Sequence, residues 1–173
     1  MGTHIDGFLP YATDRSLEAV GKLLNAVFDG LQSDLALIRE RGRFSKQTVN
    51  WWLTSDESTL TGEGPCGFSI VVYPMVIAFT SVERFGAIEH PDLGIHTSLR
   101  RVFETTAMSF GANDRLAVAA GGFGDTDRAA DIAAGAGRFA DVCGCLETVI
   151  GPPALTWDAL ETGAGNWYWR GHM

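Results

Sequence analysis

The stretch FSIVVYPMVIAFT, from Phe68 to Thr80, decides the fold of this 173-residue chain. Its two halves, 68–73 and 75–80, are rich in the β-branched and aromatic residues that strands favour. Pro74 separates them and has no backbone N–H to donate to a neighbouring strand. We therefore predict two consecutive central strands, or one long strand bent at the proline.

An amphipathic helix is expected on either side of this stretch. Between residues 14 and 31 apolar side chains recur at three- and four-residue steps, behind a candidate cap at Thr13 or Asp14. After the stretch, Thr97 or Ser98 can cap a second helix that has an apolar face of its own. Two helices that bracket adjacent strands are typical of an antiparallel sheet.

Further elements complete the predicted order. We expect strands over 4–11, with Pro10 at an edge or an end, and over 116–120; a third helix over 126–140; and a last strand within 141–150. The fold class is therefore α+β: one globular domain, 1–173, with a mainly antiparallel sheet and two or three helices packed on one face. A ferredoxin-like split βαβ core fits this order, and a doubly wound α/β sheet is the alternative.

Two segments are less regular. Residues 33–53 are compatible with a helix or a strand, and 55–67 have the polar, glycine-rich composition of a loop. If 48–54 form a strand, Trp51 and Trp52 point to opposite faces, so one ring is buried and the other is exposed. The sequence does not decide which of the two is exposed.

Composition limits the classes of function. The net charge of -8 argues against a protein that neutralises nucleic-acid phosphates and favours a partner with a basic face. Three cysteines, an odd number, and no signal-peptide pattern predict a reduced, cytoplasmic protein. The longest apolar run is much shorter than the roughly 20 residues of a membrane helix, so a soluble protein is expected.

The glycine-rich turn after the strand at 116–120 resembles a phosphate-binding loop in composition only. A dinucleotide fingerprint requires glycine where Asp127 stands, and a P-loop requires a lysine, which the chain does not contain after position 46. Asp125, Asp127 and Asp131 either stabilise the start of the following helix or hold a divalent cation. Helix stabilisation is the preferred interpretation, and we predict neither a cofactor nor a metal.

The cysteines do not form a recognisable motif. Cys143 and Cys145 lack the two-residue spacing of zinc and redox sites, so we expect structural thiols. Cys66, with His90 or His96 as a base, is a conceivable nucleophilic pair whose geometry the sequence does not reveal.

The leading functional hypothesis is a bacterial protein-binding domain of the inhibitor or immunity type, which neutralises a toxin or effector by covering it. Acidic side chains would attract a basic partner and tryptophans would anchor it. The candidate partner-binding residues are Asp125, Asp127, Asp131, Trp52, Trp167 and Trp169, the last two in an aromatic-rich tail, 155–173. The alternatives are a small enzyme, using a metal at the aspartates or the Cys66 thiol, and a structural subunit or adaptor; self-association is compatible with all three.

Overall fold

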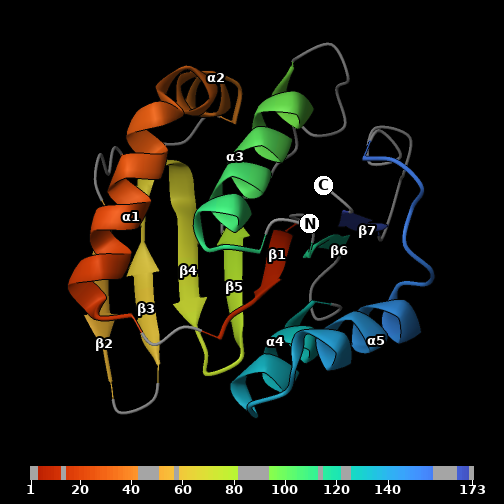
Figure 1. Ribbon diagram of the computed structural model, residues 1–173. Helices are drawn as coiled ribbons and strands as arrows, with labels where there is room; N and C mark the ends of the chain where they lie inside the picture. The colour runs from red at the N-terminus through yellow and green to blue at the C-terminus, as the bar shows by residue number, and fades with distance from the viewer. Residues whose placement is uncertain are drawn as a thin grey trace.

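A computed structural model describes residues 4–12, 15–42, 51–56, 59–81, 94–112, 115–121, 126–157 and 167–171 (Figure 1). The strands in these ranges are β1 (His4–Pro10), β2 (Trp52–Ser55), β3 (Leu60–Glu63), β4 (Phe68–Val72), β5 (Val76–Ser81), β6 (Leu116–Gly121) and β7 (Trp167–Gly171). The helices are α1 (Leu17–Gly30), α2 (Gln32–Gly42), α3 (Ile95–Ser109), α4 (Asp127–Ala134) and α5 (Phe139–Val149), with a 3-10 turn at Pro65–Gly67.

The strands form one antiparallel sheet in the order β2-β3-β4-β5-β1-β6-β7. Its four central strands contain the split βαβ motif: β1 leads through α1 to the hairpin β4-β5, and β5 leads through α3 to β6, on the other side of β1. The predicted antiparallel α+β fold is confirmed. The doubly wound alternative is wrong, because every ladder between these strands is antiparallel.

Helices α1, α2 and α3 cover one face of the sheet, and Figure 1 shows α1 and α3 side by side across it. The Ser16 side chain caps α1 by accepting a hydrogen bond of 3.2 Å from the Ala19 N–H. The apolar stripe of α1 then faces the core, where Phe28 lies 5.0 Å from the Trp51 ring, measured between centroids. Gly7 of β1 leaves room for Phe103 of α3, whose ring would lie 2.6 Å from a Cβ there.

Helices α4 and α5 pack on the opposite face, against Ala117 and Ala119 of β6 among others. The prediction of one helix over 126–140 and a strand within 141–150 is wrong, because the chain breaks the helix at Gly135–Gly137 and resumes helical structure at Phe139. A Cβ on Gly137 would lie 2.7 Å from the Ile132 carbonyl oxygen, so this close turn requires glycine. Within the described ranges, helices therefore cover both faces, three on one and two on the other, rather than one face alone.

Two further segments differ from the expectation. Part of the predicted loop, 55–67, is the strand β3, in which Leu60 and Gly62 are buried and Thr61 and Glu63 are exposed. Its polar composition conceals the alternation that defines a half-buried strand. The ambiguous segment 33–53 begins with a helix, α2, and ends with β2.

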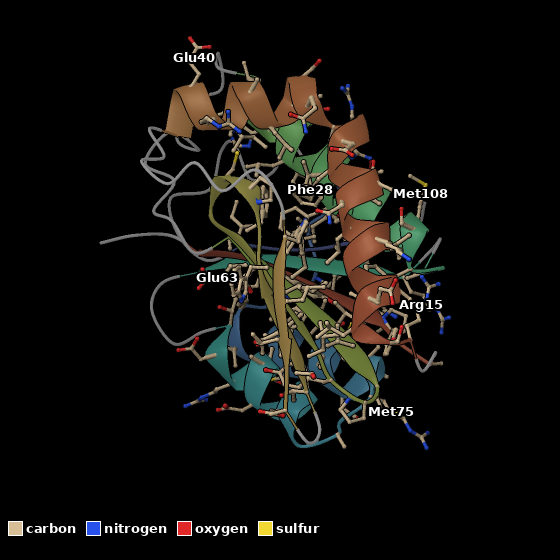
Figure 2. All side chains as sticks on the ribbon, turned by 90° about the vertical axis from the view of Figure 1, so that its left-hand side faces the viewer. Arg15, Phe28, Glu40, Glu63, Met75 and Met108 are labelled. Carbon is tan, nitrogen blue, oxygen red and sulfur yellow. The ribbon has the colours of Figure 1, made fainter. Side chains whose placement is uncertain are left out.

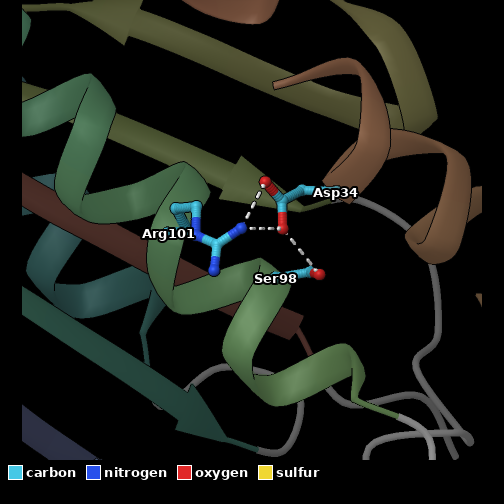
Figure 3. A network of polar contacts seen from close by, with 3 residues as sticks. All are labelled: Asp34, Ser98 and Arg101. Carbon is cyan, nitrogen blue, oxygen red and sulfur yellow. Dashed lines mark hydrogen bonds and ion pairs between the residues drawn. The ribbon is translucent and has the colours of Figure 1, made fainter. Parts of the chain in front are cut away.

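A polar network fixes α2 against α3 (Figure 3). The buried Asp34 carboxylate accepts a hydrogen bond of 2.9 Å from the Ser98 hydroxyl and two of 3.1 and 3.2 Å from the Arg101 guanidinium. Because a buried carboxylate is costly without donors, these contacts make the approach of the two helices specific. None of the helices in the described ranges is long and apolar enough to cross a membrane.

Candidate functional site

The second face of the sheet is covered only in part. The helices α4 and α5 pack over β5, β1, β6 and β7 through Ala78, Phe8, Ala117 and Tyr168. Over the other three strands, β2 to β4, the same side of the sheet carries residues that are exposed or half-buried: Trp52, Thr54, Thr61, Glu63, Ser69 and Val71. We call these six residues the open face. They border a shallow depression of about 520 Å³.

The strand registers arrange the open face as two rows. Trp52, Glu63 and Ser69 are opposite one another across β2, β3 and β4, and Thr54, Thr61 and Val71 form the second row. The two threonine hydroxyl oxygens lie 2.9 Å apart. Figure 2 shows Glu63 on the side of the sheet away from Phe28 and α1.

The structure assigns different environments to the two adjacent tryptophans. Trp51 is 8% exposed and packs in the core, and its backbone N–H donates to the Asn25 side chain at 3.2 Å. Trp52 is 73% exposed. Leu53, on the same side as Trp51, packs against the core, so the alternation along the strand directs the Trp52 ring to the open face.

The structure does not bring the other predicted partner-binding tryptophans to this surface. Trp169 is 6% exposed and packs edge-on against Trp157, with 5.3 Å between ring centroids, so its ring is part of the core of this domain. The ring is buried because β7 adds to the sheet beside β6, and Trp169 faces the larger core. Trp167 is the first residue of β7, and its side chain lies outside the described part of the structure.

The acidic residues lie at the start and on the outer side of α4. Asp127 and Asp131 are both exposed, and Asp127 is in the first turn, where a carboxylate stabilises the helix. Asp125 lies outside the described residues. Burial, and then the negative charge of Asp131, raise the pKa of Tyr73. Tyr73 directly follows β4, so this side of α4 lies near the end of that strand. Among the described residues, no group of three or more metal-ligating side chains comes together.

The thiols are mostly internal. Cys66 is 1% exposed and donates a hydrogen bond of 3.4 Å to the Leu35 carbonyl oxygen. His96 is buried in α3, and His90 lies outside the described ranges. Cys143 is buried in α5, where burial raises the pKa of its thiol. The three cysteines are free thiols, and Cys145 is half-buried.

Sequence reasoning missed a second concave surface. Arg115, Arg138 and Arg170 line a depression of about 440 Å³ together with aromatic side chains that include Phe110 and Phe139. These arginines are isolated in the sequence, and only the pairing of β6 with β7 and the turn into α5 bring them together. No short-range pattern could have indicated this cluster.

Comparison with protein-family models, with curated proteins and with solved structures found no match for this chain.

Proposed function

We propose that this chain is a protein-binding domain of the inhibitor or immunity type, and that it docks a protein partner on the open face. The observation that carries the proposal is the exposure of Trp52, 73% of its surface, on a part of the sheet that α4 and α5 leave uncovered. Tryptophan is enriched among the residues that dominate binding energy at interfaces. A large rigid ring offers a wide contact area and loses little conformational entropy on binding.

The surroundings of Trp52 suit an anchor. The two adjacent residues of its row, Glu63 and Ser69, and the threonine pair in the second row are short or polar side chains on a rigid sheet. Such side chains can form a rim that excludes water from a central aromatic contact. A surface built on strands also keeps its shape when the partner arrives, which limits the entropy cost of association.

Charge selects the kind of partner. Glu63 is the one ionisable side chain among the six residues of the open face, and the chain as a whole has a net charge of -8. The exposed Asp127 and Asp131 of α4 belong to the helical layer on the same side of the sheet. A basic partner would therefore be steered towards this side and would associate more slowly as salt is added.

The free thiols favour a reducing compartment, so we place this function in the bacterial cytoplasm. There the domain would neutralise a toxin or effector by covering its functional surface. This mode of action requires a stable complex and no chemistry by the domain itself.

Titration calorimetry tests the proposal with purified basic proteins encoded by neighbouring genes as partners. An unrelated basic protein serves as the control for nonspecific attraction. We expect one of these partners to bind, and Trp52→Ala to weaken binding by about 2 kcal/mol, roughly thirtyfold. Met108→Ala is the matched control, because Met108 is an exposed apolar residue, 49% exposed, on α3 at the other side of the sheet.

The proposal fails if none of these proteins binds, or if a partner binds the Trp52→Ala variant as tightly as it binds the wild-type chain. Sedimentation of the free chain gives a second readout. A dimer that Trp52→Ala dissociates would mean that the open face binds a second copy of this chain, and it would replace the inhibitor hypothesis with self-assembly. For a toxic partner, co-expression should restore growth with the wild-type chain and with Met108→Ala but not with Trp52→Ala.

A further inference from the structure

The open face contains one pair of side chains whose chemistry suits a cation. Trp52 of β2 and Glu63 of β3 are directly opposite one another in the antiparallel ladder, and both are exposed. Opposite residues on one face of such a ladder have Cβ atoms about 4.5–5.5 Å apart. The indole ring and the carboxylate are therefore neighbours, and both border the same depression.

The two groups attract positive charge for different reasons. The face of an aromatic ring has negative electrostatic potential, and tryptophan binds cations better than tyrosine or phenylalanine does. A carboxylate carries a full negative charge and accepts strong hydrogen bonds from ammonium and guanidinium groups. One cation could therefore contact Trp52 and Glu63 together.

The described part of the chain supplies no cation to this pair. Among the described residues, three arginines lie over aromatic rings and three ion pairs form, and neither set includes Trp52 or Glu63. The residues directly beside the lining of the depression in the sequence are all described, and none of them is charged: 51, 53, 55, 60, 64, 68 and 72. A cation at this pair would come from another molecule.

A hydroxyl group makes the surface suitable for a guanidinium in particular. Ser69 of β4 is opposite Glu63, so it continues the row that begins with Trp52. Its hydroxyl donates to the Thr80 carbonyl oxygen at 3.5 Å, which leaves lone pairs that can accept further hydrogen bonds. A guanidinium has its N–H donors in one plane, pairs with a carboxylate through two of them and stacks on aromatic rings, whereas an ammonium group is a compact point charge. The row therefore fits arginine better than lysine.

We propose that the open face receives an arginine side chain of its protein partner, with the guanidinium on the Trp52 ring and paired with the Glu63 carboxylate. This inference rests on the proposed protein-binding function, and it names the side chain that the open face recognises. The net charge of -8 supports it, because an acidic chain attracts a basic surface over a longer distance. The contacts at Trp52 and Glu63 then hold one arginine in place.

An NMR titration of the full chain with three probes tests the proposal: N-acetyl-arginine amide, N-acetyl-lysine amide and N-acetyl-citrulline amide. Citrulline has nearly the shape of arginine and no charge. The reporter is the indole N–H signal of Trp52, which is identified by its loss in Trp52→Phe. At constant ionic strength, the arginine probe should bind about threefold or more tighter than the citrulline probe, because it adds a cation–π contact and an ion pair. The proposal is overturned if the arginine probe leaves the signal unmoved, or if it binds no more tightly than either of the other two probes.

A charge-removing variant locates the contact. Glu63→Gln should weaken binding of the arginine probe by about twofold to fivefold, because it removes the carboxylate charge and keeps the size of the side chain. Glu40→Gln is the matched control: Glu40 is an exposed glutamate of α2, and Figure 2 shows it far from Glu63. Both variants change the net charge equally, so their difference excludes long-range attraction. Equal affinity of the two variants for the arginine probe refutes the role of Glu63.

The same substitutions separate this inference from the proposed function. With a protein partner in the calorimeter, Glu63→Gln should weaken the complex and Glu40→Gln should not. A complex that Trp52→Ala weakens and Glu63→Gln leaves unchanged would retain the protein-binding function and refute the arginine contact. Binding of the arginine probe in the absence of any protein partner would have the opposite meaning, because the cation site would stand and the protein-binding function would not.

Discussion

Trp51→Ala should lower the stability of the protein, whereas Trp52→Ala should weaken partner binding and leave stability almost unchanged. Trp51 is 8% exposed and lies among the rings of Phe28 and Phe79, at 5.0 and 6.0 Å between centroids. Its ring also covers Gly64 so closely that a Cβ there would lie 2.5 Å from it. Trp52 is 73% exposed and has none of these contacts.

These environments set the magnitudes. Trp51→Ala removes a buried ring and leaves a cavity, which costs about 3–5 kcal/mol. For a domain of this length each kcal/mol lowers the melting temperature by roughly 2–4 °C, so we expect a decrease of about 6–20 °C. An exposed substitution such as Trp52→Ala changes stability by no more than about 0.5 kcal/mol, which is roughly 2 °C or less.

Far-UV circular dichroism during heating and urea denaturation measures both variants beside the wild type. The difference between the two midpoints is the decisive quantity, because the same residue type is removed from adjacent positions. If Trp52→Ala destabilises the protein as much as Trp51→Ala, the ring of Trp52 is part of the core. The open face would then lose its anchor, and the proposed function would lose its main support.

Two further substitutions, and the dependence of stability on pH, test the fold. Gly64→Ala should destabilise the protein by about 1–3 kcal/mol in urea, because the new methyl group meets the Trp51 ring, and an unchanged midpoint would contradict that packing. Asp34→Ala removes the acceptor of the buried Ser98 hydroxyl and of the exposed Arg101 guanidinium and should cost about 1–3 kcal/mol, again from urea midpoints; a loss under about 0.5 kcal/mol would mean that the network is not needed. Burial raises the pKa of Cys143 and of Tyr168 above their ordinary values of 9.0 and 10.0, so the unfolded chain loses these protons first and stability should fall as pH rises above about 9. Tyr168→Phe should flatten this fall, and a stability that rises between pH 9 and 11 would refute the assignment.

Sequence patterns predicted the elements that have a clear period. The stretch from Phe68 to Thr80 gives β4 and β5, with Pro74 in the turn between them, and the three- and four-residue spacing gives α1. The strand β3 was missed because Thr61, Gly62 and Glu63 carry little apolar character, and its formation depends on pairing with β2 and β4. Tertiary contacts decided its structure.

The candidate site was predictable to a lesser extent. Alternation indicated that one of the two adjacent tryptophans is exposed, but the choice of Trp52 depends on which face of β2 meets α1. The burial of Trp169 could not be predicted, because an aromatic-rich tail gives no sign of the strand that it joins. Arg115, Arg138 and Arg170 line one depression because α5, β6 and β7 are close together in the fold. No local sequence pattern predicts that arrangement.

The position of β1 has a consequence for how the chain folds. This strand lies inside the sheet, and its partners come much later in the chain: Ile5 is opposite Ser81 in β5 and Ala120 in β6. The hairpins from β2 to β5 can form from neighbouring segments, whereas β1 must close two long loops before both of its edges are paired. We therefore expect slow folding, limited by the docking of β1, during which an apolar strand with unpaired edges favours association between chains at high concentration.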